Sequence, residues 1–261
     1  MSRLRARFDA CRAEGRAALV AYLTFADPDP ATTVEIVLAA AAEGADVIEL
    51  GVPFSDPSAD GPVIQAAMER ALKAGGSLPG ALDAIAAIRA RGATVPIVLF
   101  GYYNPIFVYG VDRFAARAAA VGVDAVLTVD LPIDELDELR VPLAAHGVDV
   151  IPLVAPTSTD ARIARVRALD APFVYYISLT GVTGAGGGGA VDPTRIAAIR
   201  AATGSPVAVG FGIKTPADAA RVGALADGVV VGSAIVSTIA GAADPAAAVG
   251  AFVGALRAGL G

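Results

Sequence analysis

The chain has 261 residues, of which 55% are hydrophobic, and its formal net charge at pH 7 is −6. This length suits one large domain, and the hydrophobic fraction is ample for its core. With 26 acidic residues against 20 basic ones and no Lys/Arg cluster that forms a basic face, the composition argues against nucleic acid and anionic membranes as partners.

Eight short apolar runs, rich in β-branched residues, recur along the chain, and we predict a strand at each. They cover residues 18–24, 47–51, 97–100, 125–129, 148–154, 173–178, 207–210 and 228–231. The runs are apolar nearly throughout rather than alternating, which is typical of strands buried on both faces.

Segments with helical spacing of their apolar residues separate these runs, and a first helix precedes them all. The segments cover residues 31–43, 62–74, 78–91, 111–121, 134–146, 159–169, 193–203 and 216–225. Pro193 and Pro216 suit the first turn of a helix, and Asp160, Asp192 and Thr215 are candidate N-caps or first-turn residues.

The alternation of strand and helix predicts an α/β fold with a parallel sheet. Eight such units indicate a single (β/α)8 TIM barrel with extra short helices, forming one domain over residues 1–261. An open doubly wound sheet is the alternative. That fold usually has a G-x-G-x-x-G turn after its first strand, and residues 24–28 do not form one.

Nothing in the sequence predicts export or membrane insertion. No apolar stretch follows the arginines near the N-terminus, and no run of about 18 apolar residues exists, so we expect neither a signal peptide nor a membrane span. Cys11 is the only cysteine, so no intramolecular disulfide can form, which fits a reducing compartment. We therefore expect a cytoplasmic protein.

The chemistry of a barrel lies at the carboxyl ends of its strands, and two carboxylates fall there. Glu49 shares a face of the second strand with Val47 and Gly51, where an unpaired charge is costly unless its pKa rises or a partner exists. We favour a functional carboxylate over a structural ion pair. Asp60, in the next loop, either caps the helix that begins near Pro62 or supplies a second functional carboxylate.

Three later strand ends carry further candidate features. The aromatic segment 100–103 either stacks on a flat substrate or packs in the core. Segment 179–190, rich in small residues, forms either a lid or a plain exposed loop. Glycines near residues 210–212 and 232, followed by an apolar stretch at 234–239 that we interpret as a short extra helix, predict a phosphate site.

Other chemistries fit the sequence poorly. The lysines, Lys73 and Lys214, both fall outside the predicted strands, where a Schiff-base lysine would lie. His146 and Cys11 fall on helices, far from any cluster of ligands, so we expect no metal and no His-based triad. General acid–base catalysis by carboxylates on a phosphorylated substrate is what remains.

These segments also resemble a known family. Residues 48–57, 59–62 with Ile64 and Gln65, 181–184, 210–213 and 232–236 are ordered and spaced as in tryptophan synthase α subunits. The resemblance extends over essentially the whole chain, and the first stretch is close to diagnostic.

The resemblance implies a retro-aldol cleavage of indole-3-glycerol phosphate to indole and glyceraldehyde 3-phosphate. Glu49 would protonate C3 of the indole and take the proton of the glycerol hydroxyl, and Asp60 would accept or stabilise the indole N–H proton. The implied substrate pocket comprises Tyr22, Phe100, Tyr102, Leu127, Tyr175 and Thr183, with Tyr175 beside Glu49. The implied phosphate site comprises the backbone amides of Gly184, Gly212, Gly232 and Ser233.

The resemblance also implies a partner, the pyridoxal-phosphate-dependent β subunit of an αββα complex, and no cofactor in this chain. Pro53, Asp56 and Asn104 would lie in the loops that face that partner, and the loops 53–60 and 179–190 would couple closure to it. We expect the lid at residues 183–190 to be disordered without ligand.

Some positions depart from the family pattern. Ala26 stands where glycine is common, and Phe100 stands where leucine is common, which would narrow the indole pocket. Leu179, Thr180 and the four glycines at 186–189 change the lid. The carboxylate pair is intact.

Three other functions stay open at this point. The first alternative is another phosphate-binding barrel, such as indole-glycerol-phosphate synthase or phosphoribosylanthranilate isomerase. These enzymes share the phosphate-binding end of the barrel but not the sequence around Glu49 and Asp60. A barrel that mainly binds and activates a partner subunit is the second alternative. The third is a stand-alone indole-producing lyase of the same family.

Overall fold

The computed structural model describes residues 2–177, 191–210 and 212–261. Its strands form one parallel sheet in the order β5-β4-β3-β2-β1-β9-β8-β7-β6. The strands are β1 (Ala18–Thr24), β2 (Val47–Gly51), β3 (Ile97–Gly101), β4 (Ala125–Thr128), β5 (Asp149–Val150), β6 (Leu153–Val154), β7 (Val174–Ile177), β8 (Val207–Gly210) and β9 (Gly228–Val231).

The two strands at the ends of this order are consecutive in the chain, so the sheet closes into a ring. Only Ile151 and Pro152 separate β5 from β6. The Ile151 amide donates to the Val126 carbonyl of β4 at 2.9 Å, and the Pro152 carbonyl accepts from the Tyr175 amide of β7 at 3.0 Å. The predicted eight-stranded barrel is confirmed. The predicted strand at 148–154 is two short strands, because Pro152 has no N–H for the ladder.

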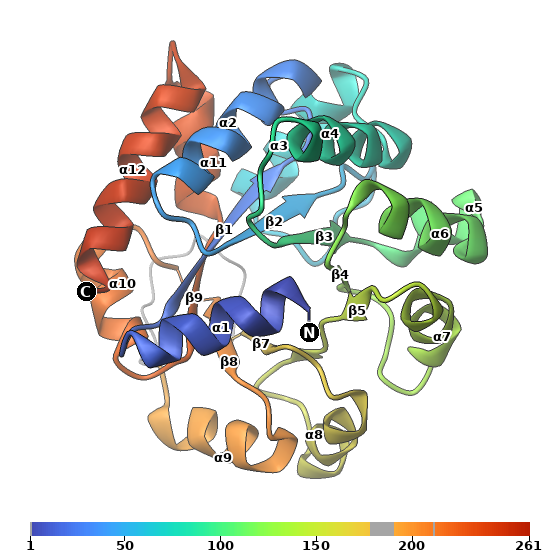
Figure 1. Ribbon diagram of the computed structural model, residues 1–261, viewed down its shortest axis with the longest axis vertical. Helices are drawn as coiled ribbons and strands as arrows, with labels where there is room; N and C mark the ends of the chain where they lie inside the picture. Colours follow the sequence, from blue (N-terminus) through green and yellow to red (C-terminus); the bar gives the residue numbers. More distant parts are fainter. Residues whose placement is uncertain (1, 178–190, 211) are drawn as a thin grey trace.

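Helices surround the strands, and α1 lies across one end of the barrel (Figure 1). They are α1 (Arg3–Ala13), α2 (Pro30–Ala42), α3 (Pro62–Lys73), α4 (Leu78–Ala90), α5 (Tyr103–Tyr109), α6 (Val111–Val121), α7 (Asp137–Ala145), α8 (Asp160–Val166), α9 (Pro193–Thr203), α10 (Pro216–Gly223), α11 (Ser233–Gly241) and α12 (Pro245–Gly259). The helix predicted at 159–169 ends in a 3-10 turn, Arg167–Leu169. Among the described helices, none has the length and hydropathy that a membrane crossing requires.

The three predicted cap or first-turn residues all lie at helix starts. Asp192 caps α9, and Thr215 forms a reciprocal capping box with Asp218 at α10. Thr159, rather than Asp160, is the N-cap of α8, and Asp160 lies in the first turn. Two helices, α5 and α12, lie outside the predicted set.

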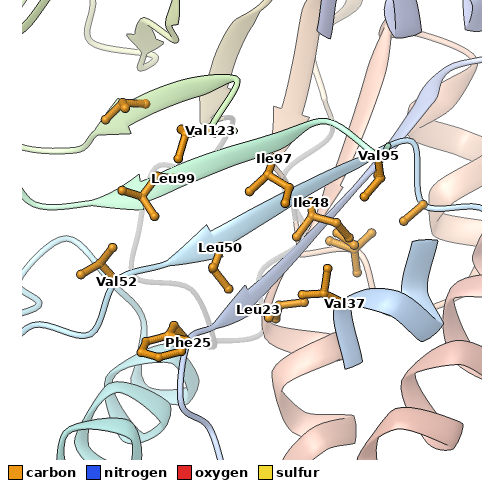
Figure 2. Packing of buried hydrophobic residues seen from close by; sticks show 14 of the residues in the cluster. Leu23, Phe25, Val37, Ile48, Leu50, Val52, Val95, Ile97, Leu99 and Val123 are labelled. Carbon is orange, nitrogen blue, oxygen red and sulfur yellow. The ribbon is translucent and has the colours of Figure 1, made fainter. Parts of the chain in front are cut away.

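Each strand separates an outer apolar layer from an inner one, and its side chains alternate between the two. This alternation determines on which face Glu49 lies. Ile48 and Leu50 point outward, where they pack near Leu23 of β1 and Val37 of α2 (Figure 2). The neighbouring position Val47 belongs to the interior cluster, which α1 closes with Leu4, Phe8 and Cys11. Because side chains alternate along a strand, Glu49 shares the interior face with Val47.

Two buried aspartates and one partly buried aspartate tie the strands together at the amino end of the barrel. Asp46, Asp124 and Asp227 each precede a strand and accept from the amide of Leu19, Ile97 and Val207, respectively, at 2.8 to 2.9 Å. Each also pairs with an arginine; Asp124, for example, binds Arg89 at 2.9 Å.

We expect Asp124→Ala to lower the free energy of unfolding by about 3–5 kcal/mol, because it removes the charged partner of the partly buried Arg89 guanidinium and leaves the Ile97 amide without its side-chain acceptor. Urea unfolding measures the change. Asp83→Ala is the control, since the Asp83 side chain is 69% exposed in its pair with Arg117 and its loss should cost about 0–1 kcal/mol. Equal losses in the two variants would contradict a structural role for the buried aspartates.

Candidate active site

Glu49 lies in β2 inside the barrel and is fully buried. Neither carboxyl oxygen has a hydrogen-bond partner among the described residues, so those residues offer no structural ion pair. Burial raises the pKa of Glu49 from 4.5 to about 8. A carboxyl group in this state is mostly protonated at pH 7 and can donate a proton to a substrate.

Asp60 lies in the loop between β2 and α3, and its carboxylate is held by Tyr102. The Tyr102 hydroxyl donates to Asp60 Oδ2 at 2.7 Å and accepts from the Ala59 amide at 3.0 Å. Partial burial raises the pKa of Asp60, and the Tyr102 hydrogen bond opposes that rise. The N-cap of α3 is Gly61, with no side-chain cap, so Asp60 is not the helix cap.

Two tyrosines, the buried Tyr22 and the partly buried Tyr175, flank Glu49. Tyr22 of β1 is the direct neighbour of Glu49 across the strand pair. Burial, and secondly the nearby Glu49 carboxyl, raise the pKa of Tyr175 well above 10, so this phenol stays neutral. Each tyrosine leans over a glycine of the next strand: a Cβ at Gly51 would lie 2.4 Å from the Tyr22 hydroxyl oxygen, and a Cβ at Gly210 would lie 2.4 Å from that of Tyr175. Only glycine leaves room there.

Phe100 links the two tyrosines into one aromatic wall. Its ring meets Tyr22 edge-on with centroids 5.2 Å apart, and its centroid lies 6.5 Å from that of Tyr175. Leu127 is its neighbour on β4 and is fully buried. The described wall is aromatic and apolar, a surface against which an indole ring can pack. Tyr102, predicted to line the pocket, stacks on Phe54 and bonds Asp60.

The predicted phosphate-binding residues at the start of α11 lie beside this wall. Gly232 is the N-cap of α11 and makes no side-chain cap bond, and Ser233 is the first residue of that helix. A Cβ at Gly232 would lie 3.5 Å from Cδ1 of Tyr22, so the helix start and the aromatic wall are adjacent. Amides in the first turn of a helix lack intrahelical partners and favour an anion. Gly212 has a φ of +36° and lies in the turn after β8.

Two predicted site residues, Thr183 and Gly184, lie outside the described residues. So do the predicted lid at 179–190, its order without ligand, and the departures at Leu179, Thr180 and the four glycines. These stay predictions.

The lysines that a Schiff-base mechanism would need lie outside the barrel interior. Lys73 and Lys214 are both exposed, the first on α3 and the second beyond β8. Within residues 2–177, 191–210 and 212–261, no group of three or more His, Cys, Asp or Glu side chains is placed to hold a metal ion. The carboxyl groups of Glu49 and Asp60 are the candidate acid–base groups at this end of the described barrel.

The predicted partner-facing residues differ in exposure. Asp56 and Asn104 are exposed, whereas Pro53 is buried. Beside Asn104 on α5, Phe107 is 60% exposed and Val108 is 76% exposed. The sequence alone does not distinguish these two residues from apolar core residues, because their exposure depends on how α5 packs in the fold.

The chain is similar over its length to proteins of one family. The sequence model described as "Tryptophan synthase alpha chain" matches residues 8–255. A relative of that name from Geobacter sulfurreducens is 52% identical over 100% of both chains. A solved structure of Mycobacterium tuberculosis tryptophan synthase is 41% identical, covers 99% of this chain and 98% of its own, and superposes with a TM-score of 0.91. The tryptophan synthase alpha chain of Legionella pneumophila is 37% identical with a TM-score of 0.89, over 99% and 97% of the two chains.

Proposed function

The chain belongs to the tryptophan synthase alpha chain family, and we propose that it cleaves indole-3-glycerol phosphate to indole and glyceraldehyde 3-phosphate. The family is one of lyases in tryptophan biosynthesis. The observation that carries the proposed reaction is the fully buried Glu49 carboxyl without a partner among the described residues, beside an aromatic wall and a helix N-terminus.

The proposed steps use carboxyl groups alone. Protonated Glu49 donates its proton to C3 of the indole ring, and Asp60, ionised, stabilises the positive charge that develops at the ring nitrogen. Glu49 then takes the proton of the glycerol hydroxyl. The carbon–carbon bond breaks, its electron pair returns to the indole ring, and the aldehyde forms. Glu49 ends protonated, as it began.

The neighbouring groups position the substrate in this scheme. Tyr22, Phe100, Leu127 and Tyr175 hold the indole ring against Glu49. The start of α11, at Gly232 and Ser233, and the turn at Gly212 bind the phosphate through backbone amides. No cofactor takes part in this chain, and we retain the cytoplasmic location as a prediction.

Product analysis tests this function. The protein alone, supplied with indole-3-glycerol phosphate, should release indole and glyceraldehyde 3-phosphate in equal amounts. Ring closure or isomerisation products would instead favour another phosphate-binding barrel. An indole-glycerol-phosphate synthase needs a catalytic lysine, however, and both lysines are exposed outside the barrel.

The pH dependence of kcat/KM should be bell-shaped. Glu49 must be protonated to act first, so activity falls as pH rises through about 8, the raised pKa of this carboxyl. Asp60 must be ionised, so activity also falls in acid, at a pH above the ordinary 3.8 because burial raises its pKa. Initial rates from pH 3.5 to 10 measure both limbs. Activity that keeps rising above pH 9 would contradict a proton donor with this pKa.

We propose further that the β subunit of tryptophan synthase binds at α5, forming an αββα complex in which pyridoxal phosphate belongs to the β subunit. Phe107 and Val108 support this, since adjacent exposed apolar side chains of this size are characteristic of interaction surfaces. They lie one to two helical turns after Tyr102, the N-cap of α5, whose hydroxyl holds Asp60, so a partner there would bind the helix that begins at this support of the site.

The double substitution Phe107→Ser and Val108→Ser should weaken β-subunit binding about tenfold or more, with basal indole release unchanged. Titration of the β subunit against the rate of indole release measures the affinity. Val141→Ser on α7 is the control, since Val141 is 54% exposed on another helix. Affinity that survives the double substitution would move the interface away from α5.

A further inference from the structure

The side chain of Gln65 reaches from α3 back over the loop that carries Asp60. Its Nε2 donates to the Asp60 carbonyl at 2.9 Å and to the Pro57 carbonyl at 3.3 Å. Both acceptors are carbonyl oxygens, so only the amide nitrogen of Gln65 can occupy this place. The Asp60 amide also donates to the Pro57 carbonyl at 3.1 Å. One side-chain amide therefore holds both ends of the turn from Pro57 to Asp60.

Tyr102 holds the same turn from the opposite side. Its hydroxyl bonds the Ala59 amide and the Asp60 carboxylate. Gln65 thus fixes the backbone of Asp60 from α3, and Tyr102 fixes its carboxylate from the end of β3. The position of the carboxylate depends on both contacts.

The turn has few other restraints among the described residues. Ser58 and Ala59 are exposed, and Gly61, the N-cap of α3, makes no side-chain cap bond. Gln65 itself is exposed, so its contacts do not serve to fill the core. A turn released on one side would let the carboxylate leave the Tyr102 hydroxyl, and a displacement of about 1 Å at a reacting group can cost about a hundredfold in rate.

We propose that Gln65 is a positioning residue for Asp60, and that its amide keeps the turn 57–60 closed so that the carboxylate stays on Tyr102. This inference rests on the proposed role of Asp60 in cleavage. It gives a role to the match at Ile64 and Gln65, which the acid–base scheme alone does not use.

The first test is Gln65→Met, which keeps the length of the side chain and removes both donors. We expect kcat for indole release to fall about 10- to 100-fold and KM for indole-3-glycerol phosphate to change by less than about twofold. Glu69→Met is the matched control, since Glu69 lies one turn later on α3 and its side chain bonds only Lys73 among the described residues. An unchanged kcat for Gln65→Met, or an equal loss in the control, would overturn the proposal.

The second test repeats Gln65→Met in an Asp60→Asn background. If Gln65 acts through Asp60, the added substitution costs little there, because effects on one shared group are not additive. The same fold-loss in both backgrounds would show a general disturbance of α3 and overturn the proposal.

A third readout needs no substrate. The Ala59 N–H donates a hydrogen bond to the Tyr102 hydroxyl. Its hydrogen exchange should become about tenfold faster in Gln65→Met and stay unchanged in Glu69→Met. Unchanged exchange in Gln65→Met overturns the positioning role even if the wild type releases no indole. If the wild type releases no indole but exchange is faster in the variant, the proposed function is overturned. The role of Gln65 in holding the turn 57–60 is then still supported.

Discussion

Replacing Glu49 by glutamine is expected to lower the rate of indole release by about 10³- to 10⁴-fold. Glutamine has nearly the same size but no acidic proton for C3 of the indole ring. The Tyr175 phenol cannot replace it, because burial is the largest cause that raises the pKa of Tyr175 well above 10, and burial remains in the variant. Single-turnover indole formation with protein in excess measures the loss.

The same substitution should leave substrate binding intact and stabilise the fold at neutral pH. In the wild type, Glu49 is protonated when folded and ionised when unfolded at pH 7, because burial raises its pKa from 4.5 to about 8. Ionisation therefore favours the unfolded chain, and glutamine removes that effect. The gain in Tm should shrink as pH falls and vanish below about 4.5. A variant that is less stable than the wild type at pH 7 would show that the carboxyl has a structural partner.

Asp60→Asn is expected to lower kcat by about 10²-fold with little change in KM, because asparagine can still accept the Tyr102 hydrogen bond but carries no charge for the ring nitrogen. The loss should be smaller than for Glu49→Gln, since Asp60 stabilises charge and does not transfer a proton to carbon. Steady-state rates at pH 7 measure the change.

Glu69→Gln is the control for Asp60→Asn, because it removes an exposed carboxylate nine residues later in the chain. It should keep the wild-type rate. An Asp60→Asn variant with the wild-type kcat would remove Asp60 from the mechanism, and an equal loss in the control would attribute the effect to net charge.

The barrel was predictable because its strands are apolar on both faces and its helices carry local caps. The local sequence patterns did not predict every element correctly. Pro152 splits one predicted strand into two, and α5 has only seven residues in a segment that we interpreted from its aromatic side chains. α12 begins after the Asp244 cap but was not predicted.

Glu49 was predictable for a different reason: a charge inside an apolar strand is conspicuous in the sequence alone. The contacts that hold Asp60 were not predictable. The Tyr102 hydroxyl reaches it across 42 positions in the chain, where the end of β3 meets the loop after β2. Gln65 stands in a family motif, but its role depends on the hydrogen bonds to Pro57 and Asp60, which only the folded loop creates.

Indole release from indole-3-glycerol phosphate by the wild-type protein, followed before and after adding a tryptophan synthase β subunit, tests the central claim most directly. We predict slow release by the chain alone and a marked acceleration when the β subunit binds. Fast release that ignores the β subunit would contradict the proposed partner and indicate a stand-alone lyase. No indole under either condition would contradict the proposed reaction itself.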